Sequence, residues 1–340
     1  MEKINKSTKF YIYLMLVVFL VLISSSYARF TSSKKHDGNV TIKNHPCDTK
    51  KITSMGKEFT VNLCKPDFSK AALTKEGIFM AEDDYGESYY YRGAADNWAY
   101  FAGLYWRIVR INGDGSIRLI YDAPKGREGN YVKTEKGMYS YECKDYIIPA
   151  DPNIDVSTDE KKSRWCLRYQ NTSTSKAVND WYKTNIIDKN YEDKISDSGF
   201  CNDMTDTAEE RVTVKHEPTL KCPDKTNDFL TKANNKLKYP IGIITFDEVS
   251  FSGLTTYWPE YLENKTAYLC SPYNYMTENT VTTMTVINVD ARKIGVISAG
   301  HLFTDFGPDN GSVARPVINL KPSVTITSGD GTEASPYVIN

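Results

Sequence analysis

The apolar positions of this chain are concentrated first in one uninterrupted run close to the N-terminus. Residues 10–23 carry no charge, glycine or proline, and three lysines precede them. The stretch continues through serines to Ala28, where small side chains at positions 26 and 28 match the end of a secretory signal. Residues 1–28 are therefore predicted to be either a signal peptide cleaved near Ala28 or an uncleaved signal anchor that spans the membrane once.

Both alternatives place the rest of the chain outside the cytoplasm, because the positive charges lie before the apolar run. The predicted localisation is the cell membrane, as a single-pass protein with an extracytoplasmic C-terminal domain, or secretion after cleavage. Residues 29–70 are polar and turn-rich, which predicts a linker or stalk that includes a short hairpin. We expect residues 71–340 to form one extracytoplasmic β-rich domain with an insertion at 123–174.

The clearest strand pattern lies near the start of that domain. Residues 105–111 read YWRIVRI and residues 116–121 read SIRLIY, with Asn-Gly-Asp-Gly between them. Because Asn-Gly and Asp-Gly tolerate positive φ, the sequence predicts a β-hairpin with a tight turn. The aromatic stretches at 89–91 and 100–102 predict further strands before it.

Two segments have a helical pattern. Residues 175–186 repeat apolar side chains at helical spacing, and Ser175 is the expected N-cap. Thr245 and Glu248 match a capping box, which predicts a short helix after the buried strand at 239–244. The pattern as a whole predicts an α+β fold dominated by β-structure. Further strands are expected within residues 281–289, 293–297, 313–320 and 324–339.

Seven cysteines add a constraint, because neighbouring cysteines of an exported domain are expected to oxidise. Six of them fall into three neighbouring pairs that close loops of about 17 to 23 residues, although six cysteines allow 15 pairings. A zinc site is not indicated, since there is no CxxC motif and the four histidines are scattered. Cys270 is left free, and a buried thiol is favoured over a nucleophile. The predicted disulfides are Cys47–Cys64, Cys143–Cys166 and Cys201–Cys222.

The balance of positive and negative residues argues against one class of binding partner. The formal net charge is −1, and no basic stripe occurs, so nucleic acid is not a predicted partner. The 24 tyrosines favour half-buried strands, with an exposed aromatic surface as the alternative. Trp106 and Trp181 are expected in the core, and Arg315 is expected to pair with a carboxylate inside the fold.

Several long motifs resemble a known group of proteins. They read AEDDYGESYYYRGAADN (81–97), YWRIVRINGDGSIRLIYD (105–122), GFCND (199–203), YPIGIITFDEVSFSG (239–253), ARPVINLK (314–321) and GDGTEASPYVI (329–339). In this order they resemble an uncharacterised family of surface or secreted proteins from Gram-positive gut bacteria. The resemblance covers the chain from about residue 65 to the end and implies a surface location, but no established activity.

A more distant similarity concerns the fold. The order of a helix with a Trp-Tyr pair, a second helix after a buried strand and a closing RPVINL strand is similar to C-type-lectin-like and sulfatase-modifying-factor folds. This resemblance implies a C-type-lectin-like domain with long disulfide-stapled loops, and it implies no function by itself. The chain departs from the pattern at residues 268–272, which read YLCSP where relatives tend to carry a Trp-Thr stretch.

Two groups of side chains are candidate binding sites. Trp258, with Tyr257 and Tyr261 beside it, lies in a polar segment, where aromatic faces suit sugar stacking or fold back onto the core. Oxygen ligands for calcium are offered by Asp305, Asp309 and Asn310, with solvated acidic turns as the alternative. A second acidic cluster comprises Glu82, Asp83, Asp84 and Glu87.

No catalytic constellation is apparent in the sequence. There is no GxSxG motif, and no carboxylate pair can be selected for glycosidase chemistry. We therefore expect a non-enzymatic surface protein that binds or adheres to a glycan or a protein on a cell surface. The alternatives are a structural envelope or pilus-like subunit and an extracytoplasmic enzyme. No cofactor is expected, with calcium as the alternative.

Overall fold

The computed structural model describes residues 47–68, 71–72, 75–122, 131–134, 138, 157–204, 217–231, 236–254, 275, 281–288, 293–298, 301–306 and 312–340. The chain divides into a unit that ends at Asp48 and a second, compact unit, Thr49–Asn340. The predicted signal segment lies outside the described residues. Within the described part of the chain, no helix has the length and apolar character needed to cross a membrane.

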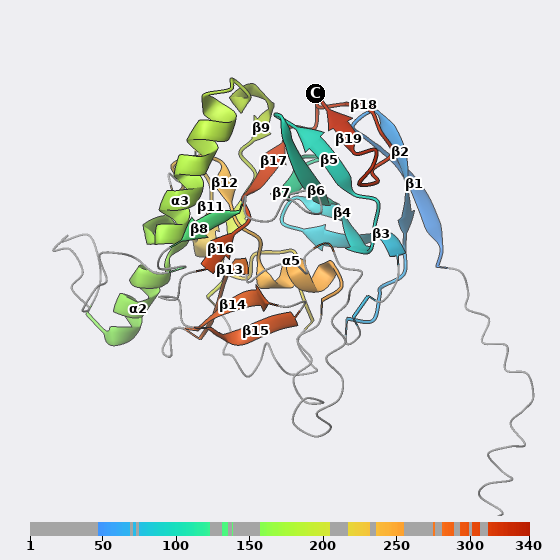
Figure 1. Ribbon diagram of the computed structural model, residues 1–340. Helices are drawn as coiled ribbons and strands as arrows, with labels where there is room; N and C mark the ends of the chain where they lie inside the picture. The colour runs from blue at the N-terminus through green and yellow to red at the C-terminus, as the bar shows by residue number, and fades with distance from the viewer. Residues whose placement is uncertain are drawn as a thin grey trace, which may run out of the picture. The chain divides into compact units, whose positions relative to one another are not determined.

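The compact unit is dominated by β-structure, as the sequence predicts (Figure 1). Its main sheet has twelve strands, eight of which form one continuous path. The hairpin that the sequence predicts within the linker belongs to this sheet, because its second strand, Lys57–Asn62, pairs in parallel with the strand Lys75–Asp83. The path runs β1 (Thr49–Ser54), β2 (Lys57–Asn62), β3 (Lys75–Asp83), β4 (Gly86–Gly93), β6 (Leu104–Ile111), β5 (Trp98–Phe101), β19 (Tyr337–Ile339) and β18 (Ile326–Ser328).

This path curls until its two ends meet. The backbone N–H of Ile326 donates to the carbonyl of Met55 in the β1–β2 turn at 2.9 Å. The ring of Tyr337 packs against Phe59 with centroids 6.1 Å apart, and the ammonium of Lys57 lies 4.6 Å from its centre. The right-handed twist of a sheet favours such curling, and the contact covers edges that would otherwise be open. Figure 1 shows β1 and β2 beside β18 and β19.

The remaining strands branch from the predicted hairpin. β7 (Ile117–Tyr121) pairs with β6 and also with β17 (Val317–Leu320), which in turn pairs with β12 (Ile241–Gly242) and β9 (Ile195–Ser196). A five-stranded sheet follows the order β15 (His301–Phe306), β14 (Lys293–Ser298), β13 (Val281–Asn288), β16 (Ser312–Ala314) and β8 (Val132–Thr134). β10 (Phe200–Cys201) and β11 (Asp228–Phe229) form a separate pair.

The predicted strand at 313–320 is split between the two sheets. β16 belongs to the smaller sheet and β17 to the larger one, and Arg315-Pro316 joins them. Proline interrupts a strand because it has no N–H to donate. The buried guanidinium of Arg315 pairs with Asp122 at 3.2 Å and donates to the carbonyl of Tyr121 at 2.9 Å. The expected pairing of Arg315 with a carboxylate is therefore confirmed.

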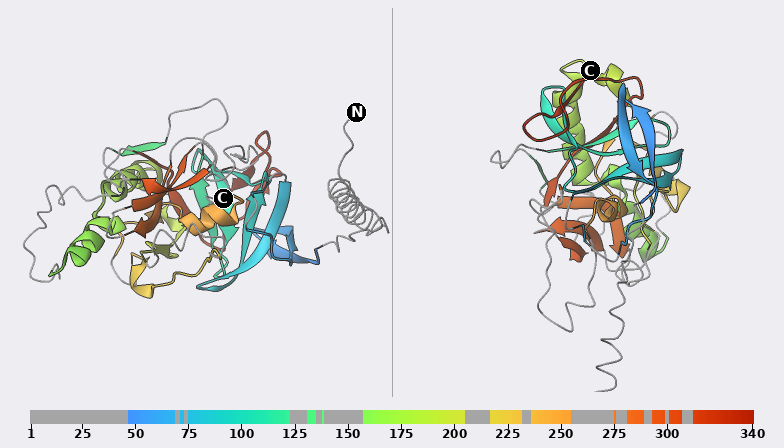
Figure 2. Two further views of the ribbon diagram at one scale, coloured as in Figure 1. Left: turned by 90° about the horizontal axis from the view of Figure 1, so that it is seen from below. Right: turned by 90° about the vertical axis from the view of Figure 1, so that its right-hand side faces the viewer.

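The helices match the predictions in part (Figure 2). α3 begins at Ser173, two residues earlier than expected, because Thr172 and not Ser175 is its N-cap. α2, within the predicted insertion, is a helix that the polar sequence did not indicate, with Thr158 as its N-cap. The bounds are α2 (Asp159–Leu167), α3 (Ser173–Tyr182) and α5 (Phe246–Phe251), with a π-helical turn at Lys183–Ile187 and 3-10 turns at Tyr169–Asn171, Glu192–Lys194 and Lys225–Asn227.

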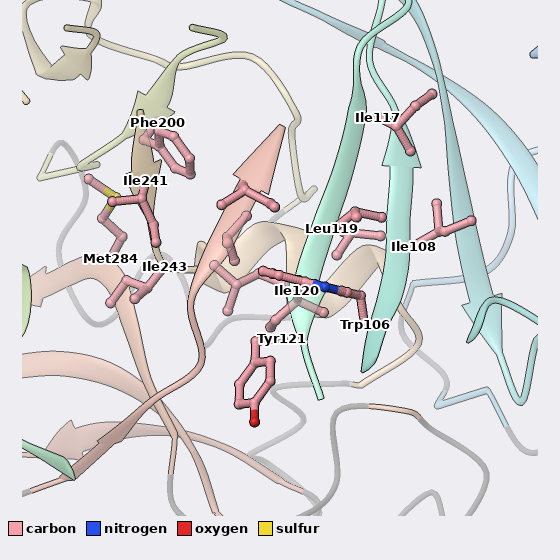
Figure 3. Close-up of a cluster of buried hydrophobic side chains, with 14 of the residues drawn as sticks. Trp106, Ile108, Ile117, Leu119, Ile120, Tyr121, Phe200, Ile241, Ile243 and Met284 are labelled. Atoms are coloured by element: carbon pink, nitrogen blue, oxygen red, sulfur yellow. The ribbon is translucent and has the colours of Figure 1, made fainter. Parts of the chain in front are cut away.

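The hydrophobic core lies around the β6–β7 hairpin (Figure 3). Trp106 is fully buried, and its ring contacts Tyr121 and Trp181 with centroids 5.8 and 5.9 Å apart. All five residues of β7 are buried, because β7 lies between β6 and β17 and both of its faces are covered. The hairpin is therefore the centre of the fold rather than a surface ribbon.

Replacing Trp106 by Ala is expected to lower the free energy of unfolding by about 3–5 kcal/mol, because the cavity would lie at this centre. Urea denaturation of the full chain measures the change. Leu63, whose side chain is 40% exposed, provides the control. Leu63→Ala is expected to stay within about 0.5 kcal/mol of the wild type. A loss below about 1 kcal/mol for Trp106→Ala would contradict this view of the core.

Candidate functional site

A narrow polar cleft lies where the β3–β4 turn, the β6–β7 hairpin and the N-terminal end of α5 meet. About 520 Å³ of space not filled by atoms lies within and in front of it, and this figure includes open solvent. Its walls also include residues between β9 and β11 on either side of a disulfide. Charged and hydroxyl-bearing side chains provide most of its lining. These groups include Asp84, Tyr85, Arg110, Arg118, Asp228 and Glu248.

Four charged side chains, Asp83, Arg110, Arg118 and Glu248, form a buried charge cluster at the floor of the cleft. Arg118 and Glu248 pair through Nε and Oε1 at 2.5 Å, and Arg110 reaches the same carboxylate at 3.3 Å. Arg110 also pairs with Asp83 at 3.4 Å. Two positive and two negative groups therefore neutralise each other, which is the usual condition for burying charge.

Glu248 has a second role within α5. Its carboxylate accepts from the backbone N–H of Thr245 at 3.0 Å, which completes the predicted capping box. Burial opposes the charged form of Glu248, but the charges of Arg118 and Arg110 and this hydrogen bond outweigh burial and lower its pKa from the ordinary 4.5. The same carboxylate therefore starts a helix and neutralises two arginines of the sheet.

The acidic turn Glu82–Asp84 holds the loop that forms one wall of the cleft. The backbone of Asp83 forms an isolated parallel β-bridge with Leu220, and the carboxylate of Glu82 pairs with Lys221 at 2.6 Å. Asp84 accepts from the backbone N–H of Cys222 at 3.0 Å and pairs with Lys225. The sequence suggested calcium or solvated acids here. The structure shows protein partners for these three carboxylates, and Glu87, the fourth of the cluster, pairs with Lys50.

A disulfide fixes the same loop from the other side. It joins Cys201 to Cys222 with their Cα atoms 5.5 Å apart, the pair that the sequence predicts. Cys47, Cys64 and Cys166 are disulfide-bonded as well. The predicted partner of Cys166, Cys143, lies outside the described residues, so that pairing stays a prediction, as does Cys47–Cys64.

Tyr85 lines the cleft, and hydrogen bonds fix both its backbone and its side chain. Its N–H donates to Asp83 at 2.8 Å, and its hydroxyl accepts from the N–H of Gly199 at 2.8 Å. Nevertheless, the residue is 41% exposed. Burial of the hydroxyl raises the pKa of Tyr85, the Gly199 N–H opposes this, and the charges of Asp228 and Asp114 add to the increase. The phenol is therefore neutral at pH 7.

Asp228 lines the cleft beside Gly199, the residue that binds the hydroxyl of Tyr85. A Cβ added to Gly199 would lie 2.1 Å from Oδ1 of Asp228, so a larger residue at position 199 would force this carboxylate to move. Burial raises the pKa of Asp228 and the charge of Asp84 adds to the increase, while Lys225, Lys236 and Arg118 lower it. Asp228 and Asp84 thus bring two interacting carboxyl groups to one side of the cleft.

The lining can form hydrogen bonds in both directions but shows no arrangement for nucleophilic chemistry. Among the lining residues there is no histidine, and its one cysteine, Cys201, is in a disulfide. The described residues contain no group of three or more His, Cys, Asp or Glu side chains placed to hold a metal ion. The geometry therefore suits recognition of a polar ligand.

The structure brings together residues that sequence reasoning did not select. Tyr85, Arg118 and Asp228 were not predicted as site residues, because they are far apart in the chain and match no motif. Asp305 lies on β15, and nothing in the described structure joins it to the cleft. The other predicted site residues lie outside the described part of the chain, namely Tyr257, Trp258, Tyr261, Cys270, Asp309 and Asn310.

Replacing Glu248 by Gln is expected to lower the free energy of unfolding by about 3 kcal/mol at pH 7, because two buried arginines lose their shared charge. The folded-state pKa of Glu248 is lowered, so its contribution is complete above its unfolded pKa and is lost as the pH falls. The difference between variant and wild type should therefore shrink between about pH 5 and pH 3.

Urea denaturation at a series of pH values measures this difference. Glu58, which pairs with Lys51 at 2.7 Å and is 61% exposed, gives the matched control Glu58→Gln, with little expected effect. A difference for Glu248→Gln that stays constant over the whole pH range would contradict the assigned role of its charge.

Comparisons with protein-family models, with curated proteins and with solved structures find no match for this chain. Evidence for the function therefore comes from the cleft and from the signals in the sequence.

Proposed function

We propose that this chain is an extracytoplasmic surface protein that binds a glycan or a protein on a cell surface, without a catalytic role. The observation that carries the proposal is the disulfide Cys201–Cys222, which fixes one wall of a polar cleft. Disulfides persist in oxidising compartments and are rare in the cytosol. The apolar N-terminal run supports export independently, as a cleaved signal or as an anchor.

Binding is favoured over catalysis by the structural role of Glu248 at the floor of the cleft. Glu248 is shared by two arginines and a helix cap, and it gives up these contacts if it takes a proton. A catalytic acid or base needs a pKa near the working pH, whereas the pKa of Glu248 is lowered. The cluster therefore acts as a rigid floor for recognition.

The finer description of the fold belongs to this proposal. A C-type-lectin-like domain is supported by the order of α3 with its Trp181-Tyr182 pair, α5 after β12, and the closing strand β17. The resemblance of the motifs to surface proteins of Gram-positive gut bacteria points the same way. Because a fold alone implies no activity, the binding role is argued from the cleft.

Two measurements on the full chain expressed in cells test the proposal. A membrane-impermeant biotin reagent applied to intact cells should label the protein, or the protein should appear in the medium. The purified full chain should then bind selectively on a glycan array or capture a surface protein of a second cell type. Both binding assays are run with and without calcium.

Trp258→Ala, in the predicted aromatic segment, is included as a variant in both assays. Labelling only after lysis would overturn the surface location. A correctly exported protein that binds neither glycans nor surface proteins would exclude the binding role, and would favour a structural envelope or pilus-like subunit instead.

A further inference from the structure

Tyr85 is an exposed aromatic side chain with a fixed position. Among the described residues, Tyr85 and Leu63 are the exposed large apolar side chains, at 41% and 40%. The two differ in setting, because Tyr85 lines the cleft and Leu63 does not. Exposing a large ring normally loses the benefit of burial, so an anchored ring at the mouth of a cleft calls for a binding explanation.

The anchoring leaves the ring in one orientation. The hydroxyl accepts from the Gly199 N–H, and the backbone of Tyr85 is bound by Asp83, which is itself held by Arg110 and by the N–H of Gly113. The turn also packs tightly, since a Cβ on Gly113 would lie 2.7 Å from the carbonyl carbon of Tyr85. An aromatic group held in this way loses little entropy when a ligand stacks on it.

The groups around the ring offer both donors and acceptors. The hydroxyl of Tyr85 accepts from the N–H of Gly199, and its hydrogen finds no acceptor within the described part of the chain. Carboxylate oxygens come from Asp84 and Asp228, which also line the cleft. A hydroxyl at an accessible cleft can donate to a ligand oxygen or to a bound water.

We propose that the cleft binds a single sugar residue of a glycan, with Tyr85 as the stacking platform. The apolar C–H face of the sugar ring lies on the exposed face of Tyr85, and its hydroxyls reach the polar groups in the narrow cleft. Each hydroxyl both donates and accepts, which matches a lining that mixes carboxylates with a guanidinium and a phenol. This inference rests on the proposed function and narrows it to a glycan.

The dimensions favour a glycan over a protein as the occupant. A stable protein–protein interface buries about 1,200–2,000 Å² and has an apolar centre. The cleft is instead narrow and charged, with Tyr85 as its exposed aromatic group. A terminal sugar needs contact with one ring and a few hydrogen bonds, and this lining provides both.

The test uses the full chain on an array of neutral, acidic and amino sugars, and glycans that bind are then titrated in solution. Tyr85→Ala should weaken binding by about tenfold or more, because it removes the platform. Tyr85→Phe keeps the ring and should weaken binding by roughly threefold at most. Leu63→Ala, an equally exposed apolar truncation outside the cleft, should leave binding unchanged.

A measurement on the wild type keeps the test decisive if Tyr85→Ala fails to fold. Hydroxyl-radical footprinting read by mass spectrometry should show that a bound glycan protects Tyr85. Glycan binding that leaves Tyr85 unprotected, or that Trp258→Ala abolishes and Tyr85→Ala does not, overturns this inference while the proposed function stands. If no glycan on the array binds but a surface protein is captured, this inference is also overturned and the proposed function stands. Failure of both array and capture overturns both proposals.

Discussion

The carboxylate of Glu248 is the contact on which the other parts of this structure depend. It caps α5 and also neutralises Arg110 and Arg118, which lie on the two strands of the central hairpin. Because a buried charge without a partner is strongly unfavourable, neither the helix nor the hairpin can shift without the other. Arg110 extends the same constraint to Asp83, and therefore to the turn that carries Tyr85. The floor of the cleft and its aromatic rim are thus fixed by one set of charges.

The disulfide acts on the opposite wall. Cys201–Cys222 holds residues 217–223 from one side, and the acidic residues Glu82–Asp84 hold them from the other. Contacts on both sides fix the positions of the polar groups in this segment. Binding residues are often found on loops that a rigid scaffold holds in this way. The same bond links the architecture to an oxidising compartment, where an exported chain would fold.

Short sequence motifs correctly predicted the elements whose turn or cap they encode. The Asn-Gly-Asp-Gly turn predicted the β6–β7 hairpin, and the Thr245–Glu248 spacing predicted the start of α5. Tertiary contacts decided the rest: Thr172 caps α3 instead of Ser175, and Arg315-Pro316 divides one predicted strand between two sheets. The cleft could not be predicted, because Tyr85, Gly199 and Asp228 come together only through the fold. The acidic cluster was visible in the sequence, but its partners were not.

We infer that the chain folds outside the cytoplasm around a polar cleft, one wall of which is fixed by the disulfide Cys201–Cys222. Tryptic digestion of the exported protein without reduction, followed by mass spectrometry, tests this inference. Cleavage after lysine and arginine gives one peptide of residues 195–211 and one of residues 222–225, each with a single cysteine. The account predicts that these two peptides are recovered as a covalent pair that separates on reduction. Recovery of Cys201 and Cys222 as free thiols, or bonded to other cysteines, would contradict it.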